Sequence, residues 1–134
     1  MSGCYLDASA IVKLATAERE SEALRAWVQE RSPLITSRIS TVEVARAIAR
    51  VTEGGVARGR AAVREVFTSV SLSELDRDIA DRAADVGPPT MRALDAIHVA
   101  TALAIGSELA EFVTYDRRLA DAARAAGLEV IAPA

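Results

Sequence analysis

The order of hydrophobic and polar positions predicts short strands that alternate with longer helices. Short apolar runs of strand length lie at residues 4–6, 33–37, 70–72, 112–114 and 128–131. Between them, apolar residues recur at helical spacing, and glycine, proline or aspartate marks several of the ends. We predict helices over residues 8–16, 19–30, 40–52, from the Gly54-Gly55 break to 68, from Asp76 to the Gly87-Pro88-Pro89 stretch, 90–105 and 117–126.

This alternation predicts the α/β class. It favours an open parallel sheet of about five short strands with helices on both faces. At 134 residues, the chain is expected to form one domain spanning residues 1–134. Ligands of such sheets bind beyond the carboxyl ends of the strands. Asp7 and Asp116 each follow an apolar strand, so they meet at one site if their strands are neighbours.

Composition narrows the class of protein. A chain with 51% hydrophobic and 26% charged residues is typical of a soluble globular domain. No run approaches the ~20 apolar residues of a membrane span, and the N-terminus lacks the features of a secretory signal. We therefore expect a cytoplasmic protein that does not contact the membrane. Cys4 is the only cysteine, which excludes an internal disulfide and a cysteine zinc site.

The charge pattern leaves nucleic-acid binding open. The net charge of −3 does not indicate a strongly basic binding surface. Of the sixteen basic residues, all except Lys13 are arginine. Arginine suits bidentate contacts to phosphate, but a GC-rich genome explains an excess of arginine and alanine equally well.

Three of the candidate acids have ordinary structural interpretations when each is taken alone. Asp7 and Asp116 stand where an N-cap is expected, between a strand and a helix. Glu43 lies on the same helical side as Arg46 and Arg50, which is typical of a solvated face with ion pairs. None of the three defines a site by itself.

Asp95 is harder to explain as a surface residue, because it lies in the most apolar helical stretch of the chain. A buried carboxylate is costly without a cation or hydrogen-bond donors. Arg92 and His98, one turn to either side, are the candidate partners. His98 is the only histidine, so a zinc site is unsupported and a hydrogen-bonded core imidazole is expected.

Taken together, the four acids and their neighbours resemble the pattern of PIN-domain ribonucleases, and in particular the VapC-type toxins of bacterial toxin–antitoxin pairs. The likeness runs from about residue 5 to residue 131, and Ser9 and Thr114 match its hydroxyl positions. Each segment is weak alone, whereas the ordered set is specific. The segments are YLDASAIVKL with Asp7, SRISTVEVARAIAR with Glu43, RALDAIHVATALA with Asp95, and FVTYDRRLADAA with Asp116.

The resemblance implies a metal-dependent endoribonuclease. It implies that Asp7, Asp95 and Asp116 bind Mg²⁺ or Mn²⁺, ions that prefer carboxylate oxygens. Glu43 would complete the acidic pocket, and the two hydroxyls would orient carboxylates and waters. The implied partners are an RNA substrate such as tRNA or rRNA, a cognate VapB-type antitoxin and a second copy of the chain. We further expect four arginines to steer substrate phosphates: Arg38, Arg92, Arg117 and Arg118.

Three alternatives belong to other classes. A haloacid-dehalogenase-like phosphatase needs an aspartate two residues after the first one, where Ser9 stands. A receiver domain needs an acidic pair before the end of the first strand, where the sequence reads Ser2-Gly3-Cys4. The remaining alternative is a catalytically silent PIN-like module that binds RNA or a protein partner. Intact acids argue against it without excluding it.

Overall fold

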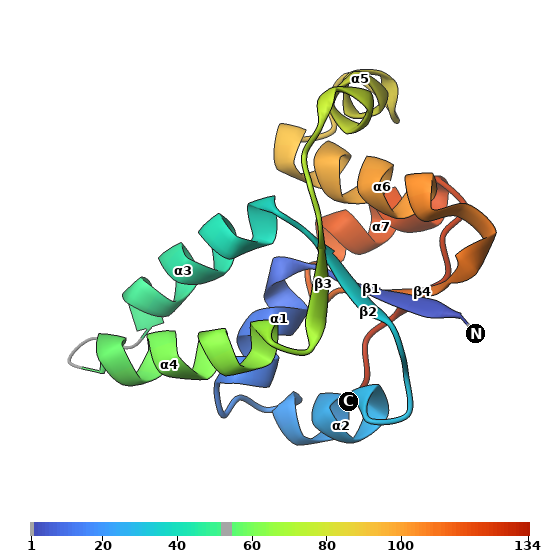
Figure 1. Cartoon of the computed structure of the whole chain (residues 1–134). Coiled ribbons are helices and arrows are strands. Elements are labelled where there is room, and N and C mark those ends of the chain that lie inside the picture. The colour runs from blue at the N-terminus through green and yellow to red at the C-terminus, as the bar shows by residue number, and fades with distance from the viewer. Residues whose placement is uncertain (1, 52–54) are drawn as a thin grey trace.

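Five parallel strands form one sheet in the part of the chain that the computed structural model describes, residues 2–51 and 55–134 (Figure 1). The strand order is β3-β2-β1-β4-β5, and every neighbouring pair is parallel. The predicted open α/β sheet is therefore confirmed. The strands are β1 (Gly3–Leu6), β2 (Leu34–Ser37), β3 (Val70–Ser73), β4 (Leu109–Val113) and β5 (Val130–Ile131).

Helices cover both faces of the sheet, with α6 and α7 on one side and α1 to α4 on the other (Figure 1). α5 packs against α6. None of the described helices is both long and apolar enough to cross a membrane. The helices are α1 (Ala8–Ala15), α2 (Ser21–Val28), α3 (Ile39–Val51), α4 (Val56–Phe67), α5 (Arg77–Asp85), α6 (Ala93–Ile105) and α7 (Arg117–Ala125), with a 3₁₀ turn over Gly106–Glu108.

Alternate residues of β1 form the two cores. Cys4 and Leu6 pack with α1, α2 and α3 on one face of the sheet. Tyr5 packs on the other face, stacked on Phe112 with ring centroids 5.0 Å apart, against α6 and α7. Successive side chains of a strand point to opposite faces, so a central strand must be apolar throughout. All of β1 is buried, as its sequence predicts.

The strand order places the site. The chain runs outward from β1 to β2 and β3, then returns to pair β4 with the other side of β1. Leu6 lies opposite Val113, so β1 and β4 end at the same level of the sheet. Residues that follow these two strands therefore meet at the point where the strand order reverses, which is where ligands bind in open α/β sheets.

Element boundaries differ from the predicted ones by a few residues. The helix predicted from residue 90 begins only at Ala93, because the Met91 N–H donates to the Pro88 carbonyl in a turn. The strand predicted over 112–114 begins earlier, at Leu109, and β5 is shorter than predicted. The predicted helix end at residue 52 and Gly54 of the predicted break lie outside the described residues.

Candidate active site

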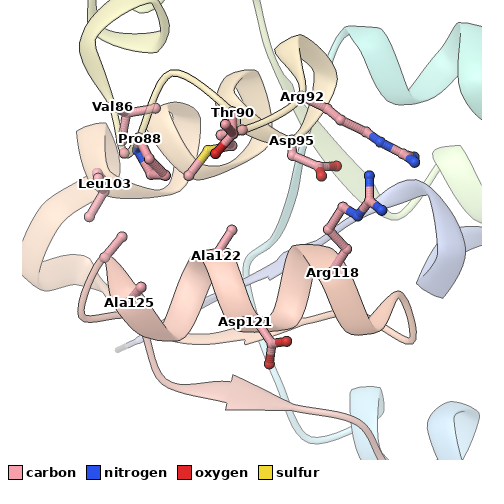
Figure 2. Close-up of a pocket in the computed structure, with 13 residues that line it drawn as sticks. Val86, Pro88, Thr90, Arg92, Asp95, Leu103, Arg118, Asp121, Ala122 and Ala125 are labelled. Carbon is pink, nitrogen blue, oxygen red and sulfur yellow. The ribbon is translucent and has the colours of Figure 1, made fainter.

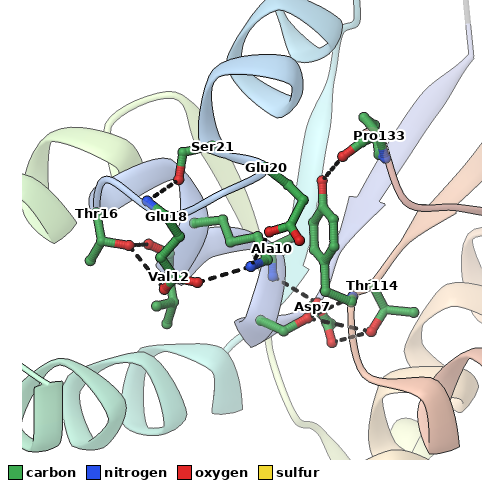
Figure 3. A network of polar contacts seen from close by, with 12 residues as sticks. Asp7, Ala10, Val12, Thr16, Glu18, Glu20, Ser21, Thr114 and Pro133 are labelled. Carbon is green, nitrogen blue, oxygen red and sulfur yellow. Dashed lines mark hydrogen bonds and ion pairs between the residues drawn. The ribbon is translucent and has the colours of Figure 1, made fainter.

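Asp7 is held rigidly at the end of β1. Its Oδ1 accepts hydrogen bonds from the Ala10 N–H (2.9 Å) and the Ser9 hydroxyl (2.7 Å), and its Oδ2 accepts one from the Thr114 hydroxyl (2.6 Å) (Figure 3). The side chain is both the N-cap of α1 and a buried carboxylate. Burial raises the pKa of Asp7, although the three hydrogen bonds oppose that rise.

Ser9 and Thr114 tie this carboxylate to the segment that follows β4. The Tyr115 N–H donates to the Ser9 hydroxyl oxygen (2.9 Å), and the Asp116 N–H donates to the Thr114 hydroxyl oxygen (3.1 Å). Each hydroxyl thus accepts from the backbone after β4 and donates to Asp7. These bonds fix Asp7 relative to a segment about 105 residues further along the chain. The two hydroxyls are the groups to which the family resemblance gave an orienting role.

Asp116 is an exposed residue at the carboxyl end of this segment and the N-cap of α7. Its Oδ1 accepts a hydrogen bond from the Leu119 N–H (3.1 Å). The capping interpretation of Asp7 and Asp116 is therefore correct for both residues. It does not compete with a role in a site, because a cap fixes the direction in which the carboxylate points.

Asp95 lies in the first turn of α6 and is only 9% exposed. Burial raises its pKa most, the negative charge of Asp116 raises it further, and Glu43 adds to the rise. A protonated His98 and the positive charge of Arg92 would act in the opposite direction. Neither forms a hydrogen bond or ion pair with Asp95 within the described residues, so the expected direct partnership is absent. Asp95 is therefore a buried carboxylate whose pKa lies above its usual value.

Glu43 on α3 is held by His98, not by the arginines of its own helix. The His98 Nε2–H donates to Glu43 Oε1 at 2.7 Å, and no ion pair joins Glu43 to Arg46 or Arg50 within the described residues. The expected solvated face with ion pairs is therefore wrong for Glu43. Helix α6 presents the imidazole to α3, which spacing along a single helix does not reveal.

Tyr5 completes a hydrogen-bonded chain. Its hydroxyl lies 2.6 Å from His98 Nδ1, and both side chains are buried. A carboxylate only accepts, so Nε2 carries the imidazole proton, and we assign the Tyr5 hydroxyl as the donor to Nδ1. Burial raises the pKa of Tyr5 well above its usual value and keeps that hydroxyl protonated. The sequence predicted the core imidazole but not Tyr5, whose polar tip in a buried strand was the available signal.

The acids therefore lie at the carboxyl edge of the sheet. The Thr114 hydroxyl connects Asp7 to the backbone of Asp116, and the charges of Asp116 and Glu43 act on Asp95. In the described part of the chain, no three histidine, cysteine, aspartate or glutamate side chains are close enough to hold a metal ion by themselves. Mg²⁺ usually keeps several waters and takes only one or two protein carboxylates. A buried carboxylate with a raised pKa among other acids fits such a hydrated ion, since a cation relieves the repulsion.

Three of the four predicted phosphate-steering arginines border the acidic edge. Arg92 and Arg118 line a pocket that also contains Asp95, and their guanidinium groups point toward one another (Figure 2). Arg117 lines an adjoining hollow together with Asp116. These positions agree with a role in binding phosphate but do not test it.

Arg38 is engaged elsewhere. Its Nε and Nη2 donate to the two carboxylate oxygens of Glu74 at 3.0 Å and 2.7 Å. Both side chains are exposed, so the pair is open to competition from a phosphate or from salt. Its predicted role in steering substrate would require this bidentate pair to open.

A parallel sheet in this order, with carboxylates where β1 and β4 end, defines the class of PIN-like proteins. The family model described as "PIN domain" matches residues 4–125. Two curated proteins of Mycobacterium tuberculosis are similar over nearly their whole length. Ribonuclease VapC46 is 42% identical over 99% of both chains, and Ribonuclease VapC35 is 44% identical over 96% of both. The chain belongs to the PIN-domain family, as the resemblance predicted, and these relatives within it are VapC proteins.

Solved structures share the fold. The M. tuberculosis protein VapC20, described as a toxin that cleaves the sarcin-ricin loop, aligns with a TM-score of 0.74 and 18% identity over 97% of this chain and 99% of that one. VapBC2 of Rickettsia felis, bound to a DNA fragment from its promoter, aligns with a TM-score of 0.73 and 9% identity over 98% and 99%. At these identities the likeness establishes the fold alone.

Proposed function

We propose that the chain is a metal-dependent endoribonuclease of the VapC type, a toxin that a cognate antitoxin silences. The observation that carries the proposal is the fixed and repelling set of acids where β1 and β4 end. Full-length relatives named Ribonuclease VapC46 and Ribonuclease VapC35 support it. The reaction class is hydrolysis of an RNA phosphodiester bond.

Asp7, Asp95 and Asp116 are the residues we assign to hold Mg²⁺ or Mn²⁺, partly through water. When bound, the ion supplies positive charge for the phosphate and activates water for attack. Without it, the acids repel one another and repel the substrate backbone. Ser9 and Thr114 keep the Asp7 carboxylate in one orientation, so that it does not have to be ordered when substrate arrives.

Glu43 is the residue we assign to position the attacking water. His98 occupies its Oε1, which leaves the other oxygen for a water. The buried Tyr5 hydroxyl holds the imidazole in the tautomer that donates to Glu43. We regard Tyr5 and His98 as positioning residues, because they act through Glu43 and do not touch substrate.

The partners follow from the same proposal. Val42 and Leu94, 60% and 49% exposed, are large apolar side chains adjacent in sequence to Glu43 and Asp95. Large apolar side chains exposed on two helices that carry site acids suit contact with a second copy of the chain, and we propose a homodimer. A VapB-type antitoxin is supported by neighbours in toxin–antitoxin complexes, including one from Klebsiella pneumoniae with a TM-score of 0.60 and 21% identity over 84% of this chain and 86% of that one. We further propose tRNA or rRNA as substrate and the cytoplasm as location.

One experiment tests the activity. Purified protein free of antitoxin is incubated with total RNA, with and without Mg²⁺ or Mn²⁺. We expect cleavage that EDTA stops and that Asp7→Asn and Asp95→Asn each reduce by at least ~100-fold. Asp81→Asn, at an exposed position of α5, is the matched control and should cut like the parent. If Asp7→Asn and Asp95→Asn cut as well as the parent, the cleavage comes from another nuclease or another site.

The same assay separates the catalytically silent alternative. A PIN-like module that only binds would retain RNA in a gel-shift measurement and leave it intact with both metals. Cleavage that depends on a metal ion would reject that alternative.

A further inference from the structure

A pocket of about 670 Å³ lies between the loop before α6 and the facing side of α7 (Figure 2). We call it the α6–α7 pocket. One end is apolar and is formed by Val86, Leu103 and Ala125, and the other end reaches Asp95 of the acidic site. Its volume is in the range of pockets that hold small organic ligands. A pocket that shares a residue with the site is placed to hold part of the same substrate.

The end near the acids carries two positive charges. The guanidinium groups of Arg92 and Arg118 lie beside Asp95, and both arginines are exposed (Figure 2). Neither guanidinium group forms an ion pair or hydrogen bond within residues 2–51 and 55–134. Two like charges that face one another are stabilised by an anion between them, and the fork of an arginine matches a phosphate.

The loop is shaped so that Met91 can line the pocket. Gly87 has φ +65°, and a Cβ at this position would overlap the Met91 Cε. A side chain at residue 87 would therefore displace the methionine. Met91 contributes a polarisable sulfur, which contacts aromatic rings favourably, and none of the described lining residues is itself aromatic.

We propose that the α6–α7 pocket binds one unpaired base of the RNA next to the phosphate that is cut, while Arg92 and Arg118 hold a phosphate of that nucleotide. This inference rests on the endoribonuclease activity proposed above, and it states how the site would recognise single-stranded RNA through one unpaired base. Proteins that read single-stranded RNA take unstacked bases into apolar surfaces beside a cationic backbone path. The pocket combines these two features within one nucleotide's reach of the acids.

The chain offers a clean probe of this pocket. Met1 and Met91 are its only methionines, so a protein labelled at the methionine methyl groups gives two NMR signals. We would titrate it with AMP, GMP, CMP and UMP, and separately with ribose 5-phosphate. We expect at least one mononucleotide to shift the Met91 signal and leave that of Met1, with a clearly smaller shift from ribose 5-phosphate. Equal shifts from ribose 5-phosphate, or none from any mononucleotide, would overturn the proposal.

Ala125→Phe should fill the pocket without entering the core, because Ala125 is exposed on α7. The matched control is Ala61→Phe, at an exposed position of α4 on the other side of the sheet. In an Asp7→Asn background, we expect Ala125→Phe to weaken binding of a fluorescent ten-nucleotide RNA by about 5- to 100-fold, the loss of contact with one base. Ala61→Phe should bind like its parent.

Arg118→Gln tests the phosphate contact without adding bulk. It should weaken RNA binding. The slope of log affinity against log salt concentration should become shallower by about 1, the change expected when one phosphate contact is lost. If Ala125→Phe and Arg118→Gln both bind RNA like the parent, the pocket does not hold RNA and the proposal fails.

These measurements do not depend on cleavage. RNA that is cut by a protein in which no mononucleotide reaches Met91 would overturn the base pocket and leave the endoribonuclease intact. A Met91 signal that responds to mononucleotides in a protein that cuts no RNA would support the base pocket and reject the proposed activity.

Discussion

Tyr5→Phe removes one buried hydroxyl from the chain of hydrogen bonds that ends at Glu43. The ring remains, so its stacking on Phe112 and its edge contact with His98, at a centroid distance of 5.8 Å, are kept. What disappears is the 2.6 Å hydrogen bond to His98 Nδ1. The imidazole then loses the donor that keeps a proton on Nε2, and with it the bond to Glu43.

The size of the effect follows from the two bonds. An acceptor left unsatisfied in the core costs about 1–3 kcal/mol, and a hydrogen bond to a charged group contributes about 1.5–3 kcal/mol. We expect the free energy of unfolding to fall by about 1–3 kcal/mol. We expect kcat to fall by about 10- to 100-fold, because ~1.4 kcal/mol in a barrier is tenfold in rate. KM should change little, since Tyr5 does not reach the substrate.

A double-mutant cycle provides the assay. Cleavage of a short RNA is measured under saturating and subsaturating conditions for Tyr5→Phe, Glu43→Ala and the double variant, with urea melts of each. If Tyr5 acts through Glu43, Tyr5→Phe should add almost nothing once Glu43 is alanine. Equal losses in the two backgrounds would refute the reasoning and leave Tyr5 with a purely structural role.

The other tyrosine supplies the control. The Tyr115 hydroxyl donates to the Pro133 carbonyl at 2.6 Å, and no hydrogen bond joins it to Glu43 in the described part of the chain. Tyr115→Phe should also cost about 1 kcal/mol of stability. Its effect on cleavage, if any, should be the same with and without the Glu43 carboxylate.

Three further predictions concern the acids and the core. The raised pKa of Asp95 means that the folded chain binds more protons than the unfolded one between the usual carboxyl pKa and the raised value. Without metal, the free energy of unfolding should therefore fall as pH rises through that window; urea melts from pH 4 to 8 should show this, and Asp95→Asn should flatten the fall. Burial raises the pKa of the Cys4 thiol to about 12, so a thiol reagent at pH 8 should label it only when the chain unfolds, and fast labelling of folded protein would contradict its burial. Ser9→Ala removes a donor to Asp7 and the acceptor for the Tyr115 N–H; we expect about tenfold slower cleavage and a loss of about 1–2 kcal/mol in urea melts, and an unchanged rate would exclude Ser9 as an orienting group.

Features that depend on neighbouring residues could be predicted from the sequence. The apolar run of β1 and the acids that cap α1 and α7 are encoded within a few positions of one another. A cap needs only a carboxylate and the next turn of backbone, and a buried strand needs only successive apolar side chains. The family could also be predicted from the sequence, because each of the four acids stands in a short motif and the motifs follow one another in the order typical of PIN domains.

What surrounds those acids was decided by packing. Tyr5 and His98 are 93 residues apart, and His98 and Glu43 are 55 residues apart. Their contact depends on how α3 and α6 lie against the sheet, which the period of each helix does not specify. From the sequence we therefore expected Glu43 to pair with its neighbouring arginines, and Asp95 to pair with Arg92 or His98.

The sequence by itself determined the order of strands and helices, the caps of α1 and α7, and the identity of the acidic residues. Only the tertiary structure decided that β4 returns beside β1, that Asp95 is buried near Asp116 and Glu43, and that a pocket opens between α6 and α7. The physical reason is the distance along the chain over which each interaction acts. Backbone preferences and caps act over a few residues, whereas a shared pocket or a hydrogen bond between helices exists only after distant segments have packed.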